Sequence, residues 1–137
     1  MAVIGLTIDK IEAERRGAAP RVEVRLTPSV TDVEKSKLEG VSEKPKDVLI
    51  VKFSFDVSFK PDVGKMKMEG SLIYMGDVDK AYKEWQKNKK LPENINTEIL
   101  NFIFRNVTPK AFFIANELQL PPILPVPRIR RRQRRES

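Results

Sequence analysis

The sequence contains neither cysteine nor histidine. The absence of cysteine excludes disulfides and thiolate nucleophiles. The absence of histidine excludes every metal site or catalytic triad that needs an imidazole. General acid–base chemistry would fall to aspartate, glutamate, lysine or tyrosine, and no paired-carboxylate motif stands out. Nucleotide-binding patterns of the GxGxxG or GxxxxGKS/T kind are also missing. We therefore predict a protein that is not an enzyme and uses no metal and no cofactor.

Long hydrophobic runs are missing as well. No apolar run reaches the roughly 18–20 residues that a membrane-spanning helix needs. The start of the chain, MAVIGLTIDKIEAE, has no basic region followed by a long apolar stretch, which a signal peptide would show. We therefore expect a cytoplasmic protein without a membrane span.

Positive charge is unevenly distributed along the chain. The 137 residues carry a net charge of +7. Residues 128–137 hold six arginines and one glutamate, a net +5, which leaves +2 for residues 1–127. We predict one folded domain over residues 1–127 and a basic, disordered tail over residues 128–137. The near-neutral domain argues against a nucleic-acid-binding face on it.

Four segments alternate between apolar and polar residues and predict strands at residues 3–15, 21–30, 47–60 and 65–76. The first shifts phase after Ile8, which indicates a bulge or bend, and Pro28 in the second is typical of an edge strand or a strand end. Residues 47–60 and 65–76 are predicted to form an antiparallel hairpin. Residues 34–47 are predicted to form a long exposed loop. We expect a four-stranded antiparallel meander with one apolar face.

Two helices follow the predicted strands. Residues 77–90 have an amphipathic pattern with Asp77 as the N-cap. Residues 95–118 are apolar over a wide arc, and they form either one kinked helix or two, the second beginning at Thr108 and Pro109. One side of this helix can cover the sheet. The remaining apolar surface must meet core, a partner subunit or a bound client. The proline-rich segment LPPILPVP, residues 120–127, is expected to run extended.

This order of elements resembles the SecB-like protein-export chaperone family over residues 3–127. The likeness lies in GLTIDKIEAE, PRVEVRLTPSV, the predicted hairpin, and the long helix followed by LPPILPV. The resemblance implies an α+β fold in which a long C-terminal helix packs on one face of the four-stranded sheet. It also implies an ATP-independent holdase that binds nonnative polypeptides in apolar grooves, as a dimer or tetramer. Unlike typical family members, this chain is basic and ends soon after LPVP in arginines.

Candidate binding residues follow from the apolar helix and the arginine tail. Each apolar residue of the predicted helix could belong to the core, to a subunit interface or to a groove that binds a client. Residues 120–126, after the helix, form either a structural strap over the sheet or the wall of a groove. The candidate polypeptide-binding residues are Ile99, Phe102, Ile103, Phe112, Phe113, Leu120, Ile123 and Leu124. The tail arginines are either solvated or contact anions such as nucleic acid, lipid headgroups or acidic partners. They are Arg128, Arg130, Arg131, Arg132, Arg134 and Arg135.

Three functions are compatible with these patterns. The first is a SecB-like chaperone for unfolded or partly folded polypeptides. The second is a nucleic-acid-associated adaptor that acts through its tail, although no aromatic side chains are interleaved with the arginines to stack on bases. The third is a purely structural homo-oligomer in which subunit contacts bury all the surplus apolar surface.

Overall fold

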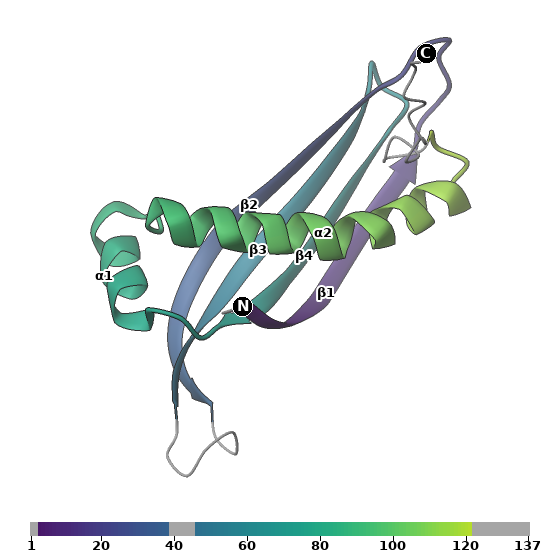
Figure 1. The fold of residues 1–137 in the computed structure, drawn as a ribbon. Helices are drawn as coiled ribbons and strands as arrows, with labels where there is room; N and C mark the ends of the chain where they lie inside the picture. Colours follow the sequence, from purple (N-terminus) through teal and green to yellow (C-terminus); the bar gives the residue numbers. More distant parts are fainter. Residues whose placement is uncertain (1–2, 39–45, 122–137) are drawn as a thin grey trace, which may run out of the picture.

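A computed structural model describes residues 3–38 and 46–121. Four strands are followed by two helices (Figure 1). The elements are β1 (Val3–Arg15), β2 (Glu23–Leu38), β3 (Lys46–Lys60), β4 (Gly64–Tyr74), α1 (Val78–Asn88) and α2 (Glu93–Glu117). The predicted α+β fold is confirmed: one antiparallel sheet has a long C-terminal helix across one face. No helix within the described ranges is both long and apolar enough to cross a membrane.

The strand order corrects the predicted meander. The sheet runs β1-β4-β3-β2, so only β2, β3 and β4 form a meander, and β1 pairs with β4. The chain passes from β1 to β2 across the end of the hairpin. There, the backbone N–H groups of Arg16 and Gly17 donate to the carbonyl of Val63 at 2.7 and 3.2 Å. Alternation in β1 fixes which side chains face the core, but it carries no information about which strand lies beside it.

The expected phase shift in β1 is confirmed as an irregularity in its pairing with β4, between Ile8 and Lys10. A second shift lies between Ile4 and Leu6, around Gly5, whose φ is +67°. Gly70 on β4 lets the two backbones approach closely, because a Cβ there would lie 2.0 Å from the carbonyl oxygen of Thr7. These features let β1 place Val3, Leu6, Ile8, Ile11 and Ala13 opposite the buried alternate residues of β4, on the core side of the sheet.

The predicted loop over residues 34–47 is wrong in part. Residues 34–38 continue β2, and Lys46 and Asp47 begin β3; the rest of the predicted loop lies outside the described residues. The charged side chains that suggested a loop belong to an edge strand, where one side of the strand faces water. Lysines, Pro28 and the irregularity between Val30 and Asp32 are typical of edge strands that avoid pairing with other chains.

The core lies between the sheet and α2. Alternate residues of β3, among them Phe53, Phe55 and Phe59, are buried on the helix side. The side of α2 that packs on these residues is a buried row with one residue in every four: Ile95, Ile99, Ile103, Val107, Ala111 and Ala115. Of the two predicted helical arrangements, the single helix is correct, because α2 continues through Pro109. Asp77 caps α1 as predicted, and its carboxylate accepts from the N–H of Lys80 at 3.4 Å.

Candidate functional site

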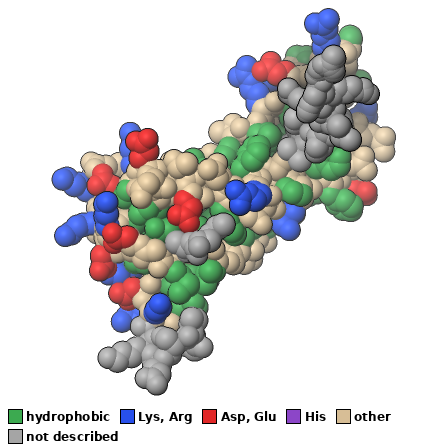
Figure 2. Space-filling view, in the orientation of Figure 1, with side chains coloured by type: hydrophobic (Ala, Val, Ile, Leu, Met, Phe, Trp, Pro, Cys, Tyr) green, Lys and Arg blue, Asp and Glu red, His purple; other side chains and the backbone are tan. Residues whose placement is uncertain are grey.

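The outer surface of α2 exposes large aromatic side chains. Phe104, Phe112 and Phe113 are 40%, 38% and 64% exposed, whereas a large apolar side chain on a helix that only covers a sheet is normally buried. Hydrophobic side chains reach the surface along α2 in Figure 2. The helix therefore has more apolar surface than its own sheet covers.

One side of α2 carries Phe104 and Phe112, whereas Phe113, the most exposed of the three, lies outside it. Leu100, Phe104, Thr108 and Phe112 are spaced four apart and so follow one another along the helix. The ring of Phe104 lies 6.5 Å from that of Phe55, centroid to centroid, with the planes tilted by 51°. One edge of Phe104 is thereby fixed on the core, while the rest of the ring remains open to water. A side chain held in this way offers contact area at little cost in conformational entropy.

Two hollows lie along this side of α2. The first hollow has a volume of about 460 Å³ and separates the helix from β2. On the sheet, the hollow is lined by Pro28, Ser29 and Val30 of β2. On the helix, it is lined by Asn96 and Leu100. Five residues from the end of α1 to the start of α2 complete the lining: Trp85, Lys89, Lys90, Leu91 and Glu93. The ammonium group of Lys89 lies 6.0 Å from the centre of the Trp85 ring, within the range of a cation–π contact.

The second hollow, of about 320 Å³, lies around Pro109. Asn101, Phe104, Arg105, Thr108 and Pro109 line it. Thr108 is 2% exposed, and its buried hydroxyl has no hydrogen-bond partner in the part of the chain that the structure describes. Pro109 has no N–H, so the carbonyl of Arg105 lacks its usual helical donor. An unpaired buried hydroxyl is costly unless a water or another bound group satisfies it.

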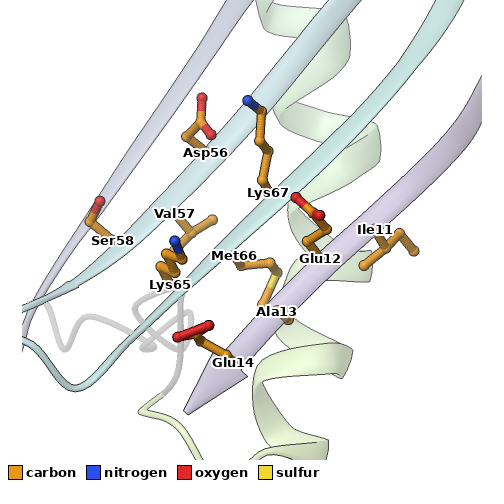
Figure 3. Close-up of a pocket in the computed structure, with 10 residues that line it drawn as sticks. All are labelled: Ile11, Glu12, Ala13, Glu14, Asp56, Val57, Ser58, Lys65, Met66 and Lys67. Carbon is orange, nitrogen blue, oxygen red and sulfur yellow. The ribbon is translucent and has the colours of Figure 1, made fainter. Parts of the chain in front are cut away.

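A third hollow, of about 660 Å³, lies against the sheet at β1, β4 and β3 (Figure 3). Glu12, Lys67 and Asp56 face one another across the three strands, in register. They alternate with buried residues and therefore project from the face of the sheet away from α2. Beside them, Arg16 binds Glu14 at 2.7 Å and Asp62 at 2.8 Å.

The charges of this third hollow do not equip it for acid–base catalysis. The Arg16 guanidinium, through its hydrogen bond and its charge, lowers the pKa of Glu14 below the ordinary value. A general acid at neutral pH needs the opposite shift, a carboxyl pKa raised toward 7. Within the described ranges no cluster of three or more acidic side chains is placed to hold a metal ion. This face of the sheet is best described as a solvated array of opposite charges.

The predicted polypeptide-binding residues divide between core and surface. Ile99 and Ile103 are fully buried against the sheet, Phe102 is half-buried, and Phe112 and Phe113 are exposed. Leu120 is 6% exposed, and its side chain occupies the space beside Gly64. Ile123, Leu124 and the six tail arginines lie outside the described residues.

Sequence reasoning did not select the residues that line the two hollows. Trp85, Phe104 and Thr108 carry no motif, and their roles depend on how α1 and α2 meet the edge of the sheet. One signal was present in the sequence. Leu100, Phe104 and Phe112 form a second apolar row beside the buried one, and an amphipathic helix that covers a single sheet needs only one such row.

The comparisons with known proteins give a likeness of fold. No family model and no curated protein matches the sequence. Among solved structures, the chain is similar to the SecB-like chaperone Rv1957 of Mycobacterium tuberculosis, solved in complex with a ChAD peptide from the HigA1 antitoxin Rv1956. The TM-score is 0.51 at 13% sequence identity, over 94% of this chain and 90% of that one. The fold is therefore SecB-like, as the order of elements predicted.

Proposed function

We propose that this protein is an ATP-independent chaperone that holds nonnative polypeptides against the outer side of α2. The observation that carries the proposal is the exposed aromatic surface of Phe104, Phe112 and Phe113 on α2, with Phe104 also lining the second hollow. The SecB-like fold supports it, since the similar mycobacterial protein is a chaperone with a bound peptide.

The geometry suits a polypeptide without a fixed sequence. Aromatic anchors bury apolar side chains of many shapes, and most of the binding free energy in such contacts comes from a few of them. The hollow beside β2 is bounded by sheet on one side and helix on the other, so an extended segment can lie along it. In the second hollow, the freed carbonyl of Arg105 is an acceptor for the backbone of a bound segment. Apolar contacts and backbone hydrogen bonds of this kind involve no nucleotide.

Suppression of aggregation tests the proposal. A chemically denatured client is diluted into buffer with increasing amounts of the protein, and light scattering is followed. We expect the wild-type chain to suppress scattering and the double variant Phe112→Ser, Phe113→Ser to lose most of this effect. Ile4→Ser is the matched control, because Ile4 on β1 is 39% exposed and pairs with Ile73 on the face of the sheet away from α2.

Two results would contradict the proposal. No suppression by the wild-type chain at several-fold molar excess would remove the holdase function. Equal loss of suppression in Ile4→Ser would show that any exposed apolar residue serves, and that α2 is not the site.

The arginine tail supports a second candidate function. Six arginines within eight residues give the tail most of the net charge, and guanidinium groups bind phosphates well. We propose that it binds nucleic acid without sequence preference. Replacing the six arginines by glutamine in the full chain should abolish salt-sensitive RNA or DNA binding while leaving chaperone activity intact. Nucleic-acid affinity that survives this replacement would place the binding site in the folded domain instead.

A further inference from the structure

The two hollows along α2 are bordered by three cations. Lys89 and Lys90 line the first hollow and Arg105 the second, and all three are exposed. None of them takes part in an ion pair within the described ranges. Glu93 is the acidic residue that lines the first hollow, and no acidic residue lines the second. The border therefore has a net positive charge.

The sheet shows the opposite arrangement. Every ion pair in the described part of the chain has its cation on a strand or, for Arg16, directly after one. The charges of the strands are thus largely neutralised by their neighbours. The positive charges beside the hollows lie next to apolar walls, which focus their field on whatever occupies the space.

A bound polypeptide would meet apolar walls and positive borders at the same time. Aromatic or aliphatic side chains would contact Leu100, Phe104 and Phe112 and displace water from them. Carboxylates a few residues away along the same chain would come within reach of Lys89, Lys90 or Arg105. Basic residues in those positions would face like charge without compensation, which disfavours binding.

From this complementarity we infer that the site selects segments in which apolar or aromatic residues are flanked by aspartate and glutamate. The inference rests on the proposed chaperone function and adds to it the chemical class of client. It assigns Lys89, Lys90 and Arg105 as specificity-determining residues, and Phe104 and Phe112 as anchors that do not discriminate by charge.

Three peptides of equal length test the inference. They share one aromatic and aliphatic core and differ in their flanks, which are acidic, neutral or basic. Binding is measured by fluorescence anisotropy with the full chain in which the six tail arginines are replaced by glutamine, so that the tail contributes no attraction. We expect the acidic peptide to bind about five- to twentyfold tighter than the neutral one at low salt, and the basic peptide more weakly than the neutral one. At about 0.5 M salt the difference should shrink to less than about twofold, because screening shortens the range of the interaction.

Two triple variants with equal change in net charge locate the effect. Lys89→Glu, Lys90→Glu, Arg105→Glu should reverse the preference in favour of the basic peptide. The control, Arg15→Glu, Arg21→Glu, Lys60→Glu, changes exposed residues near the other end of the strands and should leave the preference in place. If both variants shift the preference equally, net charge and not the border of the hollows is responsible, and the inference fails.

The remaining outcomes separate the inference from the proposed function. If the neutral peptide binds and the three flanks make no difference, the chaperone function stands and the charge selection is wrong. If no peptide binds and client aggregation is not suppressed, the proposed function itself is wrong. A preference for acidic flanks that occurs only when the tail arginines are present assigns the selection to the tail, which also overturns the inference.

Discussion

Two alanine substitutions on α2 should have opposite consequences for stability and function. The side chain of Ile103 is 0% exposed and lies at the middle of the helix row that covers the sheet. Removing it leaves a cavity in the core, and such changes lower the free energy of unfolding by about 2–5 kcal/mol. Phe113 is 64% exposed, so Phe113→Ala should change the free energy of unfolding by no more than about 0.5 kcal/mol. It should nevertheless weaken suppression of client aggregation.

Urea unfolding followed by tryptophan fluorescence measures both effects. The chain has one tryptophan, Trp85, which is buried where α1 meets the sheet. Its emission therefore reports the loss of packing of the helical layer. The dependence of the unfolding free energy on urea should be the same for wild type and both variants, because the surface exposed on unfolding hardly changes.

The result that refutes this reasoning is a large effect of Phe113→Ala. A loss of more than about 2 kcal/mol would mean that Phe113 is buried in solution. If the unfolding midpoint of the wild type also rises with protein concentration, a second copy of the chain covers α2. The surplus apolar surface would then be a subunit interface, as in the purely structural alternative. A loss of less than about 1 kcal/mol in Ile103→Ala would show that α2 does not pack on the sheet as described.

Three further substitutions test the fold. Gly70→Ala should cost at least about 2 kcal/mol in urea unfolding, because its Cβ would lie 2.0 Å from the carbonyl oxygen of Thr7; a neutral result would contradict the close approach of β1 and β4. Asp77→Ala should cost about 0.5–1 kcal/mol and reduce helical circular dichroism, since it removes the cap on Lys80; an unchanged spectrum and midpoint would show that the cap contributes nothing. Burial raises the pKa of Tyr74, so the folded state holds the phenol proton more tightly than the unfolded state. Stability from this group is complete below the unfolded pKa of about 10 and is lost as pH rises through the folded pKa. The free energy of unfolding should therefore fall between about pH 8 and about pH 11, and this fall should be smaller in Tyr74→Phe. An identical fall in both proteins would assign the pH dependence to other groups.

The sheet was largely predictable because burial on one face imposes a period of two. The alternation through Phe53, Phe55 and Phe59 appears in the structure as a buried row on β3. The neighbour of β1 was not predictable, because pairing with β2 or with β4 would bury the same side chains of β1. Gly70 carries the relevant information only once it is known to face Thr7. The charged end of β2 resembles a loop in the sequence because an edge strand and a loop expose similar side chains.

The binding side of α2 was harder to predict than the sheet. Residues four apart on an α-helix advance by about 40° around its axis, so a row of six sweeps about 200°. A long helix that crosses all four strands therefore uses different sides of itself along its length. Ile99 and Ile103 fall on the buried row and Phe112 and Phe113 outside it, although all four have the same character in the sequence. Which of them are free depends on the crossing of helix and sheet, a long-range property.

The small net charge of residues 1–127 hides a separation of charge that the fold creates. A near-neutral net charge would suit a surface without charge preference, and it predicts that any anion binding occurs in the tail. In the structure, carboxylates on the strands bind neighbouring cations such as Lys52 and Arg25. The charges that remain beside the two hollows are those of Lys89, Lys90 and Arg105 against Glu93. A domain can therefore be almost neutral in total and still present a positive border at its apolar surface. This follows from where the strands pair their charges, and composition alone does not contain it.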